Sequence, residues 1–127
     1  MKFTPGEQGF TLLELIAVMV ILSVLAAIAI PRYLSVDESA RQRAIDAAVA
    51  ELNGRETLTW SNIKITVTGY TDDTTLFSIL STTLGNDYVW QGGPPDRSGG
   101  TLKFKESTDV SLTRNESTFE KPGYWSR

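Results

Sequence analysis

A run of about 20 apolar residues near the N-terminus constrains this chain more than any other feature. The run extends from Phe10 to Ile30, is followed by Pro31, and contains one charged residue, Glu14. At about 1.5 Å rise per residue, a helix of this length spans roughly 30 Å, which is the thickness of the hydrocarbon core of a bilayer. The run therefore predicts a helix that crosses a membrane.

Glu14 is the informative residue inside the run, because a carboxylate in hydrocarbon costs about 2.5–3.5 kcal/mol on insertion scales. No basic residue lies between Lys2 and Arg32 to serve as its partner. Cleavage of the chain between Gly9 and Phe10 would create a new α-amino group about one helical turn before the carboxylate. That amine could come from the same helix or from a neighbouring subunit.

The N-terminal region resembles that of the type IV pilin and type II secretion pseudopilin family. It has a short polar leader, the residues GFTLLE at positions 9–14, and an apolar helix ending at Pro31. The resemblance implies that a membrane peptidase cuts after Gly9 and methylates the new N-terminal Phe10. It also implies that Glu14 and Phe10 act in filament assembly, with Glu14 pairing with a neighbour's N-terminus, and that Pro31 bends the helix. The implied partners are other pilin subunits in a helical polymer, the prepilin peptidase and an inner-membrane assembly platform.

Two other interpretations compete. A secretory signal peptide has an apolar core of about 7–15 residues before a small-x-small cleavage site. Residues 27–29 supply such a site, but the run is too long. A plain single-span anchor explains the length and leaves Glu14 unexplained. It also fits the positive-inside rule poorly, because Arg32, Arg41 and Arg43 follow the span while Lys2 alone precedes it.

The remaining sequence predicts an α+β fold in which one long N-terminal helix, half membrane and half amphipathic, packs on a small antiparallel β-sheet. Fewer than about 100 residues follow the membrane run, which is enough for one modest soluble domain. The predicted organisation is a leader at 1–9, a transmembrane or filament-core helix at 10–31, an amphipathic helix at 32–54 and a C-terminal antiparallel β domain at 55–127. The family resemblance makes this a pilin-like arrangement.

The amphipathic helix is expected to restart at a capping box formed by Ser35 and Glu38. Apolar residues then recur every three to four positions up to Leu52, and residues 53–54, Asn-Gly, supply a stop signal. The larger members of the apolar face are expected to contact the sheet: Ile45, Val49 and Leu52.

Alternating apolar and polar residues predict strands at 63–67 and at 102–104 and 110–112, the last two joined as a hairpin by a turn at 106–109. A further strand is expected at 88–91, a short helix at 74–84, and a Gly- and Pro-rich loop at 92–100. An irregular tail at 121–127 is expected to lay Tyr124 and Trp125 back on the sheet. The sheet side of the predicted core is Ile63, Ile65, Leu102, Phe104, Val110 and Leu112.

Composition excludes several classes of function. The net charge is −3 and no basic stripe indicates nucleic-acid binding. The chain has no Cys and no His, so a disulfide framework is excluded and an enzyme is disfavoured. The C-terminal region must be held by packing, by a metal or by neighbouring subunits. Asp72-Asp73 favours a turn or helix cap over a pair of calcium ligands, so no metal is predicted. No catalytic residue and no cofactor are predicted either. Residues 115–117 match a glycosylation sequon.

The leading functional hypothesis is a structural subunit of a pilus-like or pseudopilus filament. A secretion-type system is slightly favoured over a type IV pilus, and both stay open. The alternatives are a membrane-anchored binding module that does not polymerise, a minor pilin at a filament tip, and a small anchored enzyme. The precursor is expected in the bacterial inner membrane with its soluble domain in the periplasm, and the filament in the periplasm or at the cell surface.

Overall fold

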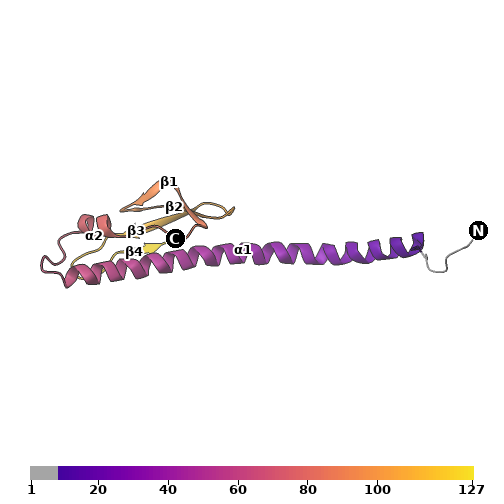
Figure 1. Cartoon of the computed structure of the whole chain (residues 1–127), viewed down its shortest axis with the longest axis horizontal. Coiled ribbons are helices and arrows are strands. Elements are labelled where there is room, and N and C mark those ends of the chain that lie inside the picture. The colour runs from indigo at the N-terminus through magenta and orange to yellow at the C-terminus, as the bar shows by residue number, and fades with distance from the viewer. Residues whose placement is uncertain (1–8) are drawn as a thin grey trace, which may run out of the picture. The chain divides into compact units, whose positions relative to one another are not determined.

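The computed structural model describes residues 9–127, which form two α-helices and one four-stranded antiparallel sheet (Figure 1). The chain divides into two compact units, Met1–Ser39 and Ala40–Arg127. The predicted α+β class, with a long N-terminal helix packed on a small antiparallel sheet, is confirmed. The elements are α1 (Leu12–Lys64), α2 (Asp73–Ile79), β1 (Tyr88–Asp96), β2 (Gly99–Phe104), β3 (Val110–Asn115) and β4 (Tyr124–Ser126).

The first unit contains the N-terminal part of α1, where every side chain from Leu12 to Ser39 is exposed. Helix α1 is long and apolar enough to cross a membrane. It passes through Pro31 and Ser35 without a break, so the expected end at Pro31 and the capping box at Ser35 are wrong. The Ser35 hydroxyl instead donates to the carbonyl of Arg32, at 2.9 Å, because backbone amides in a helix interior are already paired. Whether Pro31 bends the helix remains a prediction.

In the second unit α1 continues through Gly54 to Lys64, so the predicted stop at 53–54 and the predicted strand at 63–67 are both wrong. A glycine inside a helix costs about 1 kcal/mol relative to alanine. That cost is offset because Asn53, Arg55 and Glu56, on either side of Gly54, bond to other parts of the domain. Ile63 is buried on the helix, whereas Ile65 and Val67 beyond its end are exposed and take no part in the core.

The sheet is an antiparallel meander in the order β1-β2-β3-β4. The strands predicted at 88–91, 102–104 and 110–112 are confirmed as parts of β1, β2 and β3. The predicted loop at 92–100 is wrong, because these residues form the end of β1, a tight turn and the start of β2. Pairing is interrupted between Gln91 and Asp96, where Gly92 and Gly93 adopt φ values of +79° and +112°. Glycine-rich composition therefore marks a β-bulge here, not an irregular loop.

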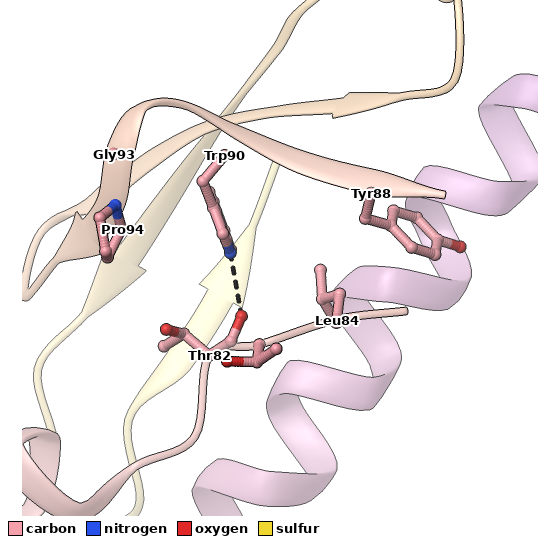
Figure 2. Close-up of a pocket in the computed structure, with 7 residues that line it drawn as sticks. Thr82, Leu84, Tyr88, Trp90, Gly93 and Pro94 are labelled. Atoms are coloured by element: carbon pink, nitrogen blue, oxygen red, sulfur yellow. Dashed lines mark hydrogen bonds between the residues drawn. The ribbon is translucent and has the colours of Figure 1, made fainter. Parts of the chain in front are cut away.

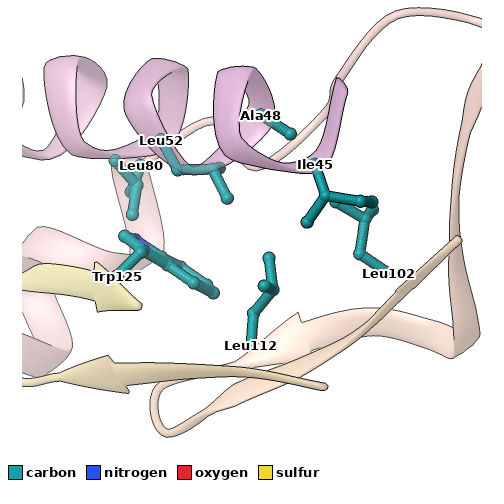
Figure 3. Close-up of a cluster of buried hydrophobic side chains, with 7 residues drawn as sticks. All are labelled: Ile45, Ala48, Leu52, Leu80, Leu102, Leu112 and Trp125. Atoms are coloured by element: carbon teal, nitrogen blue, oxygen red, sulfur yellow. The ribbon is translucent and has the colours of Figure 1, made fainter. Parts of the chain in front are cut away.

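The hydrophobic core lies between α1 and one face of the sheet (Figure 3). The predicted contacts of Ile45 and Leu52 with Leu102 and Leu112 are confirmed, and all four side chains are buried. Val49, Phe104 and Val110 pack against this cluster and are partly buried. Trp125 joins it from β4, so the tail expected to be irregular is a strand. The complete buried cluster is Ile45, Ala48, Leu52, Leu80, Leu102, Leu112 and Trp125.

Helix α2 is shorter than the helix predicted at 74–84, since it ends at Ile79 and Leu80 turns inward to the core. Asp72 is its N-cap, as the sequence predicts, and accepts a hydrogen bond from the backbone amide of Thr75 at 2.7 Å. The neighbouring Asp73 is buried and has a different role, described below.

Candidate functional site

The residues predicted to be processed, Gly9 and Phe10, lie immediately before α1 in a segment without regular structure. Both are exposed, and the Phe10 side chain is 91 % exposed. The first eight residues of the predicted leader, 1–8, lie outside the residues that the structure describes. The peptide bond between Gly9 and Phe10 therefore lies in an exposed segment outside the helix.

Glu14 and Thr11 form a capping box at the start of α1. The backbone amide of Thr11 donates to Glu14 Oε2 at 2.9 Å, and the backbone amide of Glu14 donates to the Thr11 hydroxyl at 3.2 Å. Thr11 is thus the N-cap and Glu14 the third helical residue, and two amides that the helix leaves unpaired are satisfied reciprocally. The carboxylate also lies where the helix dipole favours negative charge. Sequence reasoning assigned no role to Thr11, although the pattern T-x-x-E before an apolar run identifies it.

The capping box gives Glu14 a partner within its own chain that is a backbone amide, that of Thr11, and not the amine of Phe10. Only Oε2 is used; within residues 9–127 no hydrogen bond to Glu14 Oε1 is found, nor any between Glu14 and Phe10. Thr11 and Glu14 both lie after the predicted cut, so the box survives processing. One carboxylate can therefore cap its helix and still offer an oxygen to a second donor.

A buried charge network in the second unit was missed by sequence reasoning. Arg114 on β3 is fully buried and lies between Glu56 of α1 and Asp73 of α2. Its Nε donates to Glu56 Oε1 at 2.8 Å, and its Nη1 and Nη2 donate to Asp73 at 2.9 and 2.7 Å. Asp73 also accepts from the backbone amide and the hydroxyl of Ser117. Gly123 covers the Glu56–Arg114 pair so closely that a Cβ there would lie 2.1 Å from Glu56 Oε1.

The two carboxylates of this network differ electrostatically. Burial raises the pKa of Glu56 above its usual range, since Arg114 is shared with Asp73 and Glu56 Oε2 is buried without a hydrogen bond in the described part of the chain. Burial also acts to raise the pKa of Asp73, but hydrogen bonds from Arg114 and Ser117 outweigh it and lower that pKa to about 2. Asp73 therefore stays ionised to a lower pH than Glu56, and Glu56 is the first of the two to be protonated as the pH falls.

Further contacts hold the C-terminal segment along α1. The Asn53 side chain donates to the carbonyl of Trp125 at 3.0 Å and accepts from its amide at 2.7 Å. Arg127 pairs with Asp46, with 3.0 Å between Nε and Oδ1. With the buried Glu56–Arg114 pair, these bonds tie β3 and β4 to successive turns of α1. They supply, without cysteine, the closure of the C-terminal region that the sequence required.

The chain is similar to known proteins over part of its length. Residues 5–30 match the family model described as the prokaryotic N-terminal methylation motif. The chain is 46 % identical over 43 residues to the type IV narrow pilus major component PilA5 of Thermus thermophilus, a match that covers 34 % of this chain and 37 % of that protein. The chain thus matches little more than a third of the length of this relative. No solved structure matches the chain.

These matches confirm the predicted prepilin-type N-terminus and a homology to a type IV pilin. They agree with the expectation of a structural protein in place of an enzyme. Over residues 9–127, no group of three or more carboxylate, His or Cys side chains is arranged to hold a metal ion.

Proposed function

We propose, from the prepilin-type N-terminus that the chain carries, that the protein is a subunit of a type IV pilus-like or pseudopilus filament. The observation that carries the proposal is the N-terminal half of α1. Between Leu12 and Ile30 this half exposes apolar side chains throughout, and the one charged residue of that stretch is Glu14 in the first turn. So much apolar surface needs a cover outside the domain. The membrane covers it in the precursor, and the equivalent helices of other subunits cover it in the filament.

Processing is the first step of this function. The prepilin peptidase cuts between Gly9 and Phe10, and Phe10 becomes the N-methylated first residue. Mass spectrometry of the mature protein should show this terminus, whereas a start at Ile30 or an intact Met1 would contradict the proposal. Gly9→Val should leave the precursor uncut in the membrane, and Gly6→Val, which changes a glycine away from the cut, should be processed normally.

Assembly is the second step. The amine released at Phe10 of one subunit pairs with the free Oε1 of Glu14 in its neighbour, while Oε2 keeps the cap of its own helix. Two opposite charges at close range in a low-dielectric surrounding neutralise each other, and removing one partner of such a pair is costly. Glu14 therefore acts on assembly and not on insertion.

Three variants test this role. Glu14→Ala removes both cap and charge, Glu14→Gln keeps an oxygen for the Thr11 amide and removes the charge, and Thr11→Val removes the hydroxyl and keeps the charge. We expect both Glu14 variants to enter the membrane and be cleaved, but to yield few fibres in the sheared fraction. Thr11→Val should still assemble. Normal fibres from Glu14→Gln would show that the carboxylate serves only as a cap.

A second candidate is a membrane-anchored module that does not polymerise, or a minor pilin at a filament tip. The Thr11–Glu14 capping box favours it, because the carboxylate is partly satisfied in a single chain. Normal processing of Glu14→Ala, with no fibres from either wild type or variant, would support this candidate.

Between the two filament systems, the pilus relative now supports a type IV pilus, against the slight preference drawn from the sequence. The precursor resides in the bacterial inner membrane with residues 40–127 in the periplasm, and the filament reaches the cell surface. Deletion of the gene in its native host should remove surface fibres seen by electron microscopy. Loss of protein secretion with normal fibres would favour the pseudopilus.

A further inference from the structure

A shallow groove of about 290 Å³ lies beside the first strand of the sheet (Figure 2). It lies within the second unit and is unrelated to the N-terminal assembly residues. Its walls combine aromatic and aliphatic side chains with hydroxyl groups, and none of the lining residues is charged. The residues that line it are Thr82, Thr83, Leu84, Tyr88, Trp90, Gly93 and Pro94.

The two aromatic rings of the groove are held in fixed orientations. The indole Nε1 of Trp90 donates to the carbonyl of Thr82 at 2.9 Å, and the Tyr88 hydroxyl donates to the carbonyl of Ala44 at 2.9 Å. Trp90 also packs on buried Trp125, with 5.9 Å between ring centroids. The polar atoms of both rings are therefore hydrogen-bonded within the domain, and the rings present apolar surface to the groove. A ligand that stacks on them does not have to order them first.

The side-chain polar groups of the groove that remain free are hydroxyls. Within the described part of the chain, the side-chain hydroxyls of Thr82 and Thr83 appear in no hydrogen bond. Thr83 is exposed, and Thr82 is partly buried on the segment that faces Trp90. A hydroxyl both donates and accepts, so it suits a ligand that carries hydroxyls of its own.

The opposite wall depends on the bulge in β1. Gly92 and Gly93 have φ values that other residues rarely adopt, and they place Pro94 in the part of β1 where the regular pairing with β2 is interrupted. Figure 2 shows Gly93 and Pro94 on one side of Trp90 and Tyr88 on the other. The glycines that sequence reasoning assigned to a loop thus shape the groove.

We propose that this groove binds a neutral saccharide. A sugar ring has an apolar face of C–H groups, which suits the negative face of an aromatic ring, and an edge of hydroxyls, which suits Thr82 and Thr83. The absence of charge in the lining excludes recognition of acidic sugars by ion pairing. Proline-rich peptides also dock in aromatic-lined grooves. The carbonyls of such peptides only accept hydrogen bonds, and the two aromatic donors of this groove are already bonded. The hydroxyls of Thr82 and Thr83, which can both donate and accept, match the hydroxyls of a sugar more fully than a row of carbonyls.

The test uses the full-length protein in zwitterionic detergent micelles, whose head groups are not sugars. The indole N–H signals of the three Trp residues are followed by NMR during titration with neutral hexasaccharides: cellohexaose, chitohexaose and maltohexaose. We expect a saturable shift of the Trp90 signal with at least one sugar, and an unchanged Trp60 signal. Trp60 is the internal reference because its Nε1 is bonded to Thr118, outside the groove.

Variants then assign the contact. Thr82→Val/Thr83→Val preserves side-chain shape and should weaken binding by about tenfold, since two hydrogen bonds are lost. Thr101→Val/Thr113→Val changes two threonines of β2 and β3 and should bind as wild type. No Trp90 shift with any of the three sugars at about 10 mM, which is above the range of weak millimolar binding, would overturn the proposal. So would equal binding by both double variants, or a Trp90 shift produced by a proline-rich peptide alone.

Discussion

The two halves of α1 share one helix and differ in what surrounds them. In the first half, every side chain up to Ser39 is exposed, and Leu22 is 58 % exposed. In the second half, successive turns place Ile45, Ala48 and Leu52 against the sheet, and Leu52 is 0 % exposed. The more apolar half is the one without a core. Apolar composition therefore predicts that a surface is covered, but it does not say by what. For residues 12–30 the cover that we propose is a bilayer or other chains.

The largest expected effect would come from breaking the charge network that ties the second half to the sheet. Arg114→Met leaves Glu56 and Asp73 facing each other in a buried site. Removal of one partner from a buried ion pair costs about 3–5 kcal/mol. We expect the unfolding free energy of the domain, followed by the near-ultraviolet circular dichroism of its tryptophans in denaturant, to fall by that amount.

The control is Arg55→Met, which removes a partly exposed pair with Glu51 on the same helix, together with hydrogen bonds to the carbonyls of Ser81 and Thr83. It should cost less, because exposed pairs contribute about 0–1 kcal/mol. Equal losses from the two variants would show that the buried network does not hold the domain together.

Matched leucines test the comparison directly. Leu52→Ala should destabilise the domain by about 2–5 kcal/mol, because it opens a cavity in the core. Leu22→Ala should leave domain unfolding unchanged and act only on membrane or filament properties. Both are measured by chemical denaturation of the full chain in micelles. A domain destabilised by Leu22→Ala would mean that the two halves are energetically coupled.

The pH dependence of folding stability tests the buried charge network, which only the second half of α1 contacts. Folding raises the pKa of Glu56 above 4.5, so the stability it contributes is complete below that pH and is lost as pH rises through the raised value. Folding lowers the pKa of Asp73 from 3.8 to about 2, so its contribution is present above 3.8 and is lost as pH falls toward 2. Arg114 and the Trp125 side chain are the other groups that face Glu56.

The network is therefore most favourable near pH 4. Denaturation of Glu56→Gln, measured from pH 3 to 8, should show a smaller loss of stability above pH 4.5 than wild type. Glu51→Gln, at an exposed position of the same helix, should keep the wild-type profile. A wild-type profile for Glu56→Gln would mean that folding does not shift the pKa of Glu56.

The smallest expected effect concerns the capping box. Thr11→Val should cost about 1 kcal/mol of local helix stability, since the cap hydroxyl is lost. It should raise amide hydrogen exchange in the first turn of α1 and leave the domain unchanged. Ser35→Ala, in the middle of the helix, should have no such effect. Equal amide hydrogen exchange in the first turn of α1 in both variants would show that the Thr11 hydroxyl does not stabilise the start of the helix.

These residues also show where prediction from the sequence succeeds. The strands at 102–104 and 110–112 were predictable because alternation reports which face is buried. The same rule failed at 63–67, where tertiary bonds of Asn53 and Glu56 carry the helix past Gly54. The capping-box pattern occurs at Thr11–Glu14 and at Ser35–Glu38, and only the first lies at a helix end. The capping-box pattern forms a cap only at the start of a helix, where backbone amides are left unpaired.

The buried network was beyond the reach of local rules. Glu56, Asp73 and Arg114 belong to residue types that are mostly exposed, and they come from three elements far apart in the chain. Their burial follows from pairing that only the assembled fold creates. The glycine at position 123 is explained only by the assembled fold, because a Cβ there would collide with Glu56 Oε1.

The contact between Asn53 and Trp125 has a consequence for how the molecule avoids wrong partners. Strand β4 is an edge strand of the sheet and is only three residues long. The Asn53 side-chain amide is hydrogen-bonded to the backbone amide and carbonyl of Trp125, which another strand would need for pairing. The opposite border, β1, is interrupted by its bulge. Short, covered or bulged borders resist the strand-to-strand aggregation that leads to amyloid. Edges of this kind keep the domain from pairing strand to strand with its own copies, whatever the local concentration of the chain.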